Sequence, residues 1–175
     1  QDDQDACPPF GSYVAAPSAR ISRVHRTSGS TGRSLLIALS ALDVERTIER
    51  GGACLGAAGA GPGDLIVHCL NYCLWSGGVT DHQCLERTGA GVIPFGVGRS
   101  AELIETMLRL KPTGIHCTPS YLSRLEERLV NDFGKTPREL GLRIGLFGGE
   151  PGLQDPRFRS RIEAKWGFRA VDANY

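Results

Sequence analysis

Short apolar runs alternate with amphipathic segments along most of this chain, and this alternation limits its possible folds more than any other feature. Runs typical of buried strands lie at residues 64–70, 91–95, 113–117, 142–147 and 168–172. Segments with apolar residues at helical spacing lie at 40–60, 78–88, 101–110, 120–131 and 156–166. Strands that alternate with helices favour a mainly parallel sheet flanked by helices on both faces. The sequence therefore predicts an α/β fold.

Length and charge exclude several classes of protein. The chain has 175 residues, with 20 Lys and Arg against 19 Asp and Glu, and 41% of its residues are hydrophobic. These values are typical of a globular chain with one core, and the charge balance excludes nucleic-acid binding through bulk electrostatics. No apolar stretch approaches the roughly 20 residues that cross a bilayer, and the polar N-terminus does not resemble a secretory signal. We therefore expect a cytoplasmic protein with no membrane or nucleic-acid partner.

Six cysteines are scattered through the sequence: Cys7, Cys54, Cys69, Cys73, Cys84 and Cys117. A chain of this length does not need disulfides to be stable, so we interpret them as buried, reduced thiols of a cytosolic protein. A zinc site that combines some of them with His68 and His82 is disfavoured, because the spacing fits no regular zinc motif. In addition, the adjacent His68 and Cys69 should face opposite sides of a strand. We predict no metal ligands within the chain.

Ligands of such sheets bind beyond the carboxyl ends of the strands, so the turns that follow strands are the places to search for a site. The richest turn lies between short strands predicted at 22–26 and 35–39, and consists of Thr27, Ser28, Gly29, Ser30, Thr31, Gly32 and Arg33. Its glycines allow several backbone N–H groups to point at one anion, its hydroxyls add donors, and its guanidinium suits a phosphate. It lacks the spacing and the lysine of a Walker A loop. We favour an anion-binding loop over a Ser/Gly-rich surface hairpin.

Three other turns carry weaker signals. Residues 96–101 match a relaxed dinucleotide fingerprint, but the acidic residue that should hold a ribose is missing, so we interpret them as a tight strand-to-helix turn. Residues 71–78 (NYCLWSGG) are aromatic and rich in glycine, which suits the wall of an apolar or aromatic ligand site, although plain core is equally compatible. Residues 147–151 (FGGEP) would let a flat ring lie against the backbone. The chain has no G-x-S-x-G elbow, so it offers no candidate for nucleophilic hydrolysis.

Four segments, in chain order, are similar to motifs of one enzyme family. The first segment, RVHRTSGSTGRS, is similar to the family's phosphate loop, which is usually written T-S-G-T-T-G-K-P. The second segment is similar to the border of the family's acyl pocket and reads NYCLWSGGVTDHQCLERTGAGVIP. The third segment, CTPSYL, is similar to a Thr-Pro-Ser turn that leads from a strand to a helix in the family. The fourth, FGGEP together with an Asp and a Tyr at the chain end, is similar to the family's adenine-binding strand ends. From residue 23 to 175, the chain resembles the phenylacetate–CoA ligase branch of the adenylate-forming enzymes.

This resemblance implies an ATP-dependent ligase for an aromatic or arylacetic acid. In such enzymes the carboxylate attacks the α-phosphate of ATP, pyrophosphate leaves, and the thiol of CoA then displaces AMP from the acyl-adenylate. ATP and CoA would be co-substrates, and the ligand of a Mg²⁺ ion is expected beyond Tyr175. Two alternatives stay open at this point. The acid, an amino or aryl acid, could be transferred to the thiol of a carrier protein, or the chain could be a non-catalytic nucleotide-binding remnant.

The resemblance also implies roles for individual residues. Residues 27–33 would hold the β- and γ-phosphates of ATP, with Arg33 and His82 as the catalytic side chains and His82 near the reacting acyl group. The adenine would lie against Gly148, Gly149, Glu150 and Pro151, with Tyr175 stacked on it and either Asp172 or Asn174 at its amino group. The acid pocket would be lined by Tyr72, Trp75, Gly78 and His82. Asp81, in the same segment, is expected to face solvent.

The sequence departs from the family pattern at several of these positions. Arg33 and Ser34 replace the usual Lys-Pro, Trp75 stands where Phe is more frequent, and Gly149 stands where Ala is common. We expect an irregular lead-in at residues 1–22 and a partial AMP-binding domain at 23–175, cut at both ends, with the C-terminal lid domain absent from the chain. The 175-residue piece alone is therefore expected to be inactive.

Overall fold

The predicted parallel sheet forms the core of the larger part of the molecule. The computed structural model describes residues 2–30 and 32–173. Its sheet has five strands in the order β4-β3-β5-β6-β7, and every neighbouring pair is parallel. The strands are β3 Leu65–His68, β4 Gly91–Pro94, β5 Gly114–Cys117, β6 Ile144–Phe147 and β7 Arg169–Asp172. The α/β prediction is confirmed, with strand positions that differ from the predicted ones by a few residues at the ends.

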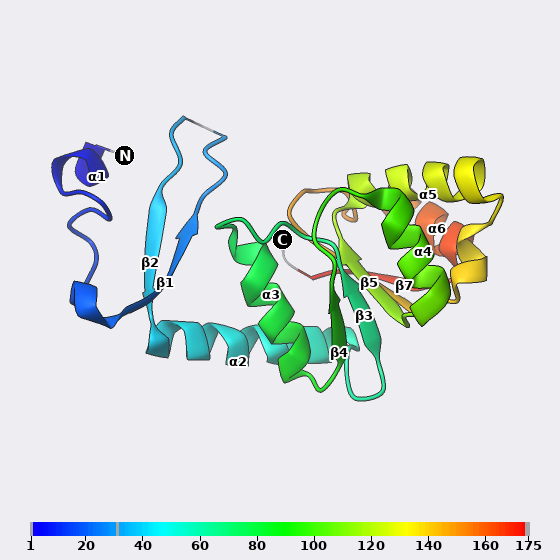
Figure 1. Cartoon of the computed structure of the whole chain (residues 1–175), viewed down its shortest axis with the longest axis horizontal. Coiled ribbons are helices and arrows are strands. Elements are labelled where there is room, and N and C mark those ends of the chain that lie inside the picture. The colour runs from blue at the N-terminus through cyan, green and yellow to red at the C-terminus, as the bar shows by residue number, and fades with distance from the viewer. Residues whose placement is uncertain (1, 31, 174–175) are drawn as a thin grey trace.

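Helices cover both faces of this sheet (Figure 1). They are α2 Ala41–Ala58, α3 Ser76–Arg87, α4 Ser100–Leu110, α5 Pro119–Phe133 and α6 Pro156–Trp166, and short 3-10 turns lie at η1 Ser18–Arg20 and η2 Pro137–Leu140. Successive strand residues point to opposite faces. Ile66 packs with α2 and α3, whereas its neighbour Val67 packs with α4, α5 and α6. Burial of one such side chain contributes about 1.5–3 kcal/mol, so the two apolar clusters hold the helices on the sheet.

The long helix α2, predicted at residues 40–60, begins where it was expected and ends two residues earlier, at Ala58. Ser40 accepts a hydrogen bond from the backbone N–H of Asp43, and the Asp43 carboxylate accepts one from the backbone N–H of Ser40. This capping box satisfies two N–H groups that the first turn leaves without helical partners. The helix ends at Gly59, which adopts a left-handed conformation with φ +106°. The cap residues are local signals, which explains why the sequence alone located this helix.

The N-terminal part forms a separate small unit. Strands β1 Ile21–Arg26 and β2 Leu36–Ser40 pair with each other in an antiparallel hairpin that does not join the large sheet (Figure 1). The prediction that residues 1–22 are irregular is partly wrong, because helix α1 spans Asp2–Ala6 and β1 begins at Ile21. The side chain of Gln4 holds α1 on β2, since it donates to the carbonyl of Leu36 and accepts from its N–H.

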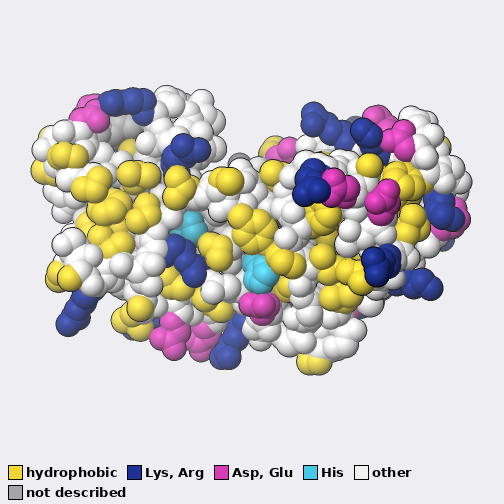
Figure 2. Space-filling model, viewed as in Figure 1, with side chains coloured by type: hydrophobic (Ala, Val, Ile, Leu, Met, Phe, Trp, Pro, Cys, Tyr) yellow, Lys and Arg dark blue, Asp and Glu magenta, His cyan; other side chains and the backbone are white. Residues whose placement is uncertain are grey.

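The face shown in Figure 2 carries both signs of charge interspersed. Hydrophobic side chains gather over the β1–β2 end of the face in that view, and exposed large hydrophobic residues of this end include Tyr13, Ile37 and Leu42. No helix within the described residues is long and apolar enough to cross a membrane.

The cysteine prediction is half correct. All six thiols are free, and Cys69, Cys84 and Cys117 are buried. Cys7, Cys54 and Cys73 are exposed, so the expectation of burial is wrong for these three. Cys7 follows the short helix α1 and Cys73 lies in the loop before α3, where the chain runs over the surface.

Candidate functional site

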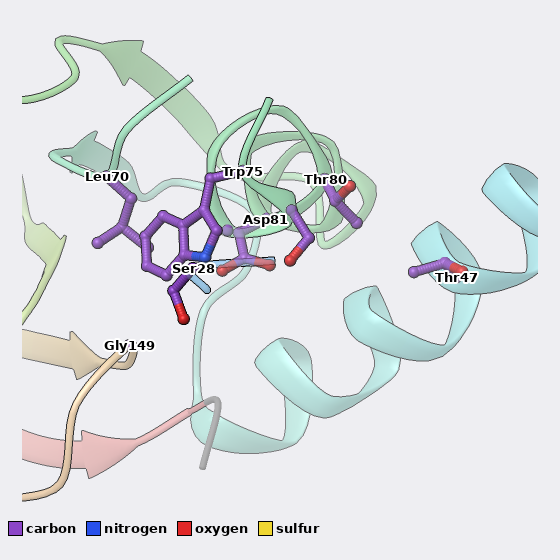
Figure 3. A pocket seen from close by; sticks show the side chains of 9 residues that line it. Ser28, Thr47, Leu70, Trp75, Thr80, Asp81 and Gly149 are labelled. Atoms are coloured by element: carbon purple, nitrogen blue, oxygen red, sulfur yellow. The ribbon is translucent and has the colours of Figure 1, made fainter. Parts of the chain in front are cut away.

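A cavity of about 520 Å³ lies beside the carboxyl edge of the sheet, and three segments distant in sequence form its wall (Figure 3). Ser28 comes from the β1–β2 turn, Gly149 follows β6, and Trp75 directly precedes α3. The other lining residues are Thr47, Leu70, Ser76, Gly77, Thr80 and Asp81. The volume lies within the range of about 300–1,000 Å³ that is usual for small-molecule sites. A second cavity, of about 380 Å³, adjoins it: it shares Leu70 and Trp75 and is lined by residues that follow β3, β4 and β5. The search at strand ends therefore leads to two adjoining cavities, of which the first receives residues from three of the predicted turns.

The carboxyl ends of the strands are level at this edge. Cys117 is paired with Phe147, and Phe147 with Asp172, so β5, β6 and β7 end at the same height. Because parallel strands all deliver their following turns to the same edge, residues after β3 and β6 meet although they are far apart in sequence. This is the reason that Leu70 and Gly149 share one cavity.

Trp75 and Gly149 are matched in size. A Cβ atom on Gly149 would lie 2.7 Å from Cη2 of Trp75, and Gly149 has φ +82°. Glycine alone adopts such a backbone without strain. The indole of Trp75 thus fills the space that a side chain at position 149 would need. This accounts together for the two departures from the family pattern, Trp in place of Phe at 75 and Gly in place of Ala at 149.

Asp81 corrects an expectation. Its side chain is 14% exposed and lines the cavity, and Figure 3 shows its carboxylate beside the Trp75 indole. The prediction that it faces solvent is wrong. Helix α3 begins at Ser76, two residues earlier than predicted, and the packing of this helix against the hairpin and the sheet turns the Asp81 face inward. Only tertiary packing sets this rotation.

The other predicted pocket residues form a cluster next to Asp81. The Tyr72 hydroxyl lies 2.9 Å from Nδ1 of His82, and Nε2 of His82 lies 3.2 Å from the carboxylate of Glu86. Burial raises the pKa of Tyr72 to about 12, so its hydroxyl keeps its proton and can donate to His82. Gly78 brings α3 close to the preceding loop, because a Cβ there would lie 2.3 Å from the carbonyl oxygen of Asn71. Of the predicted pocket set, Trp75 lines the cavity, and the roles of the others stay predictions.

The predicted phosphate loop is the turn of the β1–β2 hairpin. Thr27 closes it: its backbone N–H donates to the carbonyl of Leu35, and its hydroxyl accepts from the N–H of Leu35. Gly29 has φ +71° and accepts a hydrogen bond from the N–H of Gly32. Arg33 pairs with Asp5 of α1 on the surface. Ser30 is exposed in the same turn, and Thr31 lies outside the described residues. The structure thus shows a surface hairpin whose Ser28 reaches the cavity, and phosphate binding by this turn stays a prediction.

The predicted adenine segment follows β6. Gly148 is buried and Pro151 is exposed, and the carboxylate of Glu150 accepts a hydrogen bond from the N–H of Ser120 at the start of α5. Asp172, the last residue of β7, accepts a hydrogen bond from the Gln154 amide at 2.8 Å. Asn174 and Tyr175 lie outside the described residues. The adenine roles therefore stay predictions.

A buried histidine pair lies behind the cavity wall, and sequence reasoning missed it. His68 and His116 occupy paired positions on β3 and β5, both are fully buried, and their Nδ1 atoms are 3.0 Å apart. Nε2 of His68 donates to the carbonyl of Gly78 at 3.0 Å, so its Nδ1 accepts and Nδ1 of His116 donates. Burial lowers the pKa of His68 to about 4 and that of His116 to about 3, so both rings are neutral near pH 7. The sequence did contain a signal for this pair, because a histidine lies near the end of each of two predicted strands.

A second chain of hydrogen bonds, also missed, joins the hairpin to α3. Arg23 donates to the Thr80 hydroxyl, which lies 3.1 Å from Nε2 of His25, and Nδ1 of His25 lies 3.3 Å from the carbonyl oxygen of Leu74. A consistent direction runs from Arg23 to Thr80 to His25 to Leu74. The chain fixes Thr80, one lining residue, relative to the hairpin that carries Ser28.

Two further predicted features can be compared with the structure. Residues 96–101 form the tight turn from β4 to α4, with φ +80° at both Gly96 and Gly98, as predicted. Among the described residues, no group of three or more His, Cys, Asp or Glu side chains could hold a metal ion.

Comparison with known proteins gives a consistent answer. No family model matches the chain. A phenylacetate–coenzyme A ligase of Escherichia coli (strain K12) is 34% identical over 164 residues, which are 94% of this chain and 37% of that protein. A phenylacetate–coenzyme A ligase of Thermus thermophilus is also 34% identical over 94% of this chain, and 36% of that protein is covered. The crystal structure of an open conformation of 2-hydroxyisobutyryl-CoA ligase, in complex with 2-HIB-AMP and CoA, is 32% identical with a TM-score of 0.89, over 98% of this chain and 41% of that chain.

The resemblance to the phenylacetate–CoA ligase branch is confirmed. The chain spans 36–37% of the length of these phenylacetate–CoA ligases. Each of three segments similar to that branch, its phosphate loop, its acyl-pocket border and its adenine segment, supplies a residue to the one cavity, namely Ser28, Trp75 and Gly149.

Proposed function

We propose that the full-length gene product activates a carboxylic acid with ATP and transfers the acyl group to coenzyme A. The oxygen of the carboxylate attacks the α-phosphorus, the bond to pyrophosphate breaks, and the resulting acyl-adenylate then exchanges AMP for the sulfur of CoA. One observation carries this proposal: Ser28, Trp75 and Gly149, from the three segments similar to ligase motifs, line one cavity. Relatives named for phenylacetate and for 2-hydroxyisobutyrate support the acid class and the CoA acceptor.

Residues 23–175 are proposed to be part of an AMP-binding domain. The task of such a site is to hold two anions together and to stabilise the charge that builds on phosphorus. The turn 27–33 supplies N–H groups, hydroxyls and the Arg33 guanidinium for the β- and γ-phosphates. The first turn of α3 lies at the cavity, because Ser76 and Gly77 line it, and a helix N-terminus favours negative charge.

The acid is proposed to be aromatic or arylacetic and to lie against the indole of Trp75. Gly148, Gly149, Glu150 and Pro151 would border the adenine, with Asp172 or Asn174 at its amino group and Tyr175 stacked on it. His82, bound to Tyr72 and Glu86, would stand near the reacting acyl group. Gly78 would allow α3 to approach the loop that follows β3 closely, and so keep the border of the acid pocket compact.

Magnesium is proposed to accompany ATP, to which it supplies positive charge. No described residue group fits a metal site, so none of the described side chains is assigned to it. A cytoplasmic location is also proposed, and the six free cysteines support it, because extracellular proteins usually pair their cysteines.

Acid-dependent exchange of labelled pyrophosphate into ATP tests the first half-reaction, and CoA-dependent release of AMP tests the second. We expect exchange with phenylacetate or another aromatic acid and none without acid. An absence of exchange with every acid of an aromatic and aliphatic panel would overturn the proposed function.

A further inference from the structure

The second cavity adjoins the first at Trp75 and carries a positive charge. Leu70 and Trp75 line both cavities and lie side by side (Figure 3). Val97, an exposed apolar residue of the turn from β4 to α4, adds to this apolar wall. Of the described residues that line either cavity, Arg124 of α5 is the one with a positive charge, and none of those that line the second cavity is acidic. The second cavity therefore suits a ligand with an apolar part and an anionic group.

The donors of this cavity lie on one face of α5. Tyr121 and Arg124 are three positions apart in the helix, so their side chains are neighbours on its surface. The Arg124 side chain is exposed and forms no hydrogen bond or ion pair with any residue that the structure describes. Arg128, one turn further along, is instead paired with Asp132. A ligand can therefore bind Arg124 without breaking an existing ion pair.

A pair of hydroxyl groups adds one more donor. The hydroxyl oxygens of Ser100 and Tyr121 are 3.0 Å apart, and both residues line the second cavity. One of the two O–H protons forms the bond between them, and the other finds no acceptor within the described part of the chain. Burial raises the pKa of Tyr121, so the phenol keeps its proton near pH 7. The pair thus offers one O–H group to a ligand.

An acid with an uncharged, apolar substituent would use these donors poorly. The substituent would displace water from the guanidinium and the hydroxyl group and would offer no acceptor in exchange, which costs free energy. A carboxylate provides two acceptor oxygens and a compensating charge, and its shape matches the planar guanidinium.

We propose that the acid activated at this site is an aromatic dicarboxylic acid. One carboxylate reacts in the first cavity, the ring lies against Trp75, and the second carboxylate binds Arg124 in the second cavity. This inference rests on the proposed function and names its substrate class. Arg124 is then a residue that sets specificity, and the Ser100–Tyr121 pair supplies a further hydrogen bond.

The test compares each diacid with an uncharged acid of the same shape, by ATP–pyrophosphate exchange with the full-length gene product. One pair is terephthalate against 4-isopropylbenzoate, and the other is 1,4-phenylenediacetate against 4-isobutylphenylacetate. We expect kcat/KM to be at least about fivefold higher for the diacid in at least one pair, which exceeds the statistical advantage of its two equivalent carboxylates.

Two results would contradict the inference in different ways. A smaller ratio in both pairs, or exchange with phenylacetate but with neither diacid, overturns the inference and leaves the proposed function intact. No exchange with any of these acids, with phenylacetate or with the wider panel overturns both.

A variant separates recognition of the second carboxylate from structure. Arg124→Gln removes the charge, so KM for the preferred diacid should rise about five- to tenfold, while kcat/KM for its uncharged partner stays the same or rises. Arg124→Lys keeps the charge and should restore part of the loss. Arg128→Gln is the matched control, because Arg128 lies on the same helix and lines neither cavity, and both acids should keep their values.

A uniform loss for both acids in Arg124→Gln would overturn the inference. The comparison of acids with the unaltered protein stands even if this variant does not fold.

Coenzyme A is the other anion that Arg124 could meet, and the two half-reactions distinguish it from the acid. Pyrophosphate exchange contains no CoA, so a change in the ratio of two acids cannot come from CoA binding. A higher KM for CoA in the AMP-release assay of Arg124→Gln, with exchange unchanged for both acids, would assign Arg124 to the CoA site and overturn the inference.

Discussion

Trp75 and Gly149 determine each other's size, because a Cβ on Gly149 would lie 2.7 Å from Cη2 of the indole. We therefore expect Gly149→Ala to destabilise the protein by about 1–2 kcal/mol through its positive φ and by about 1–3 kcal/mol through overpacking. Trp75→Phe puts a smaller ring in this space, so it should remove the contribution of overpacking to the loss of stability. Urea unfolding of the two single variants and the double variant gives the coupling free energy. Strictly additive effects would show that the two residues do not compete for space.

Trp75 is also expected to select the acid. Its replacement in Trp75→Ala enlarges the cavity and removes an aromatic wall, so the relative kcat/KM values of aromatic acids should change, with bulkier acids favoured. Exchange assays with a series of acids of increasing size measure this. Tyr13→Ala is the control, because Tyr13 is an exposed aromatic residue outside the cavity lining. An unchanged profile would assign Trp75 to packing alone.

Arg33 is expected to bind phosphate in the active enzyme. Its ion pair with Asp5 joins side chains that are 70% and 53% exposed, and such pairs contribute at most about 1 kcal/mol. A charge-assisted hydrogen bond to a phosphate contributes about 1.5–3 kcal/mol, so Arg33 can exchange one partner for the other. Arg33→Ala should raise KM for ATP about tenfold or more, whereas Arg128→Ala, which breaks another surface pair, should not. An unchanged KM for ATP would exclude this role.

The buried histidine pair predicts sensitivity to acid. Burial lowers the pKa of His68 to about 4 and that of His116 to about 3, whereas in the unfolded chain both lie near 6.5. The unfolded state therefore binds more protons below about pH 6.5, and stability falls as the pH decreases toward the folded pKa values. Each histidine contributes a slope of up to about 1.4 kcal/mol per pH unit. Urea unfolding between pH 7.5 and 5 measures it.

A variant tests the origin of that slope. An Asn side chain offers an amide that can donate to Nδ1 of His68, so His116→Asn should reduce the slope by up to about 1.4 kcal/mol per pH unit. Burial also lowers the pKa of His25, so part of the slope should remain. An unchanged slope would attribute the acid sensitivity to other groups.

Asp64 is expected to matter for stability at the opposite edge of the sheet. It is 5% exposed and accepts hydrogen bonds from Arg143, Thr113 and the N–H of Gly61. Burial alone would raise the pKa of Asp64, but these hydrogen bonds outweigh burial and lower it. Asp64→Asn removes charge-assisted hydrogen bonds from Arg143, whose side chain is half-exposed, so it should cost about 1.5–3 kcal/mol of unfolding free energy. KM for ATP and acid should not change, because Asp64 lies before β3 and the cavity lies after it. A loss below 1 kcal/mol would contradict the pairing.

Local patterns were sufficient for the strands and helices that follow the N-terminal segment. The Ser40–Asp43 capping box and the glycine at position 59 are short-range signals, and a parallel sheet with two buried faces requires the near-continuous apolar strands that the sequence shows. The N-terminal helix escaped prediction because it has five residues and docks through Gln4 onto Leu36 of β2. That contact depends on a strand far away in the sequence.

The candidate site, like the fold, has features that the sequence predicts and features that only tertiary packing sets. The sequence by itself determined the order of strands and helices, the four glycine-containing turns, and the resemblance to the phenylacetate–CoA ligase branch, because these depend on neighbouring residues and on motif spacing. The tertiary structure decided which side chains share a space. The rotation of α3 against the sheet placed Asp81 in the cavity wall, the register of β3 with β5 joined His68 to His116, and the level strand ends brought Gly149 against Trp75. Periodicity gives the spacing of residues along one element, whereas packing between elements fixes their rotation and height.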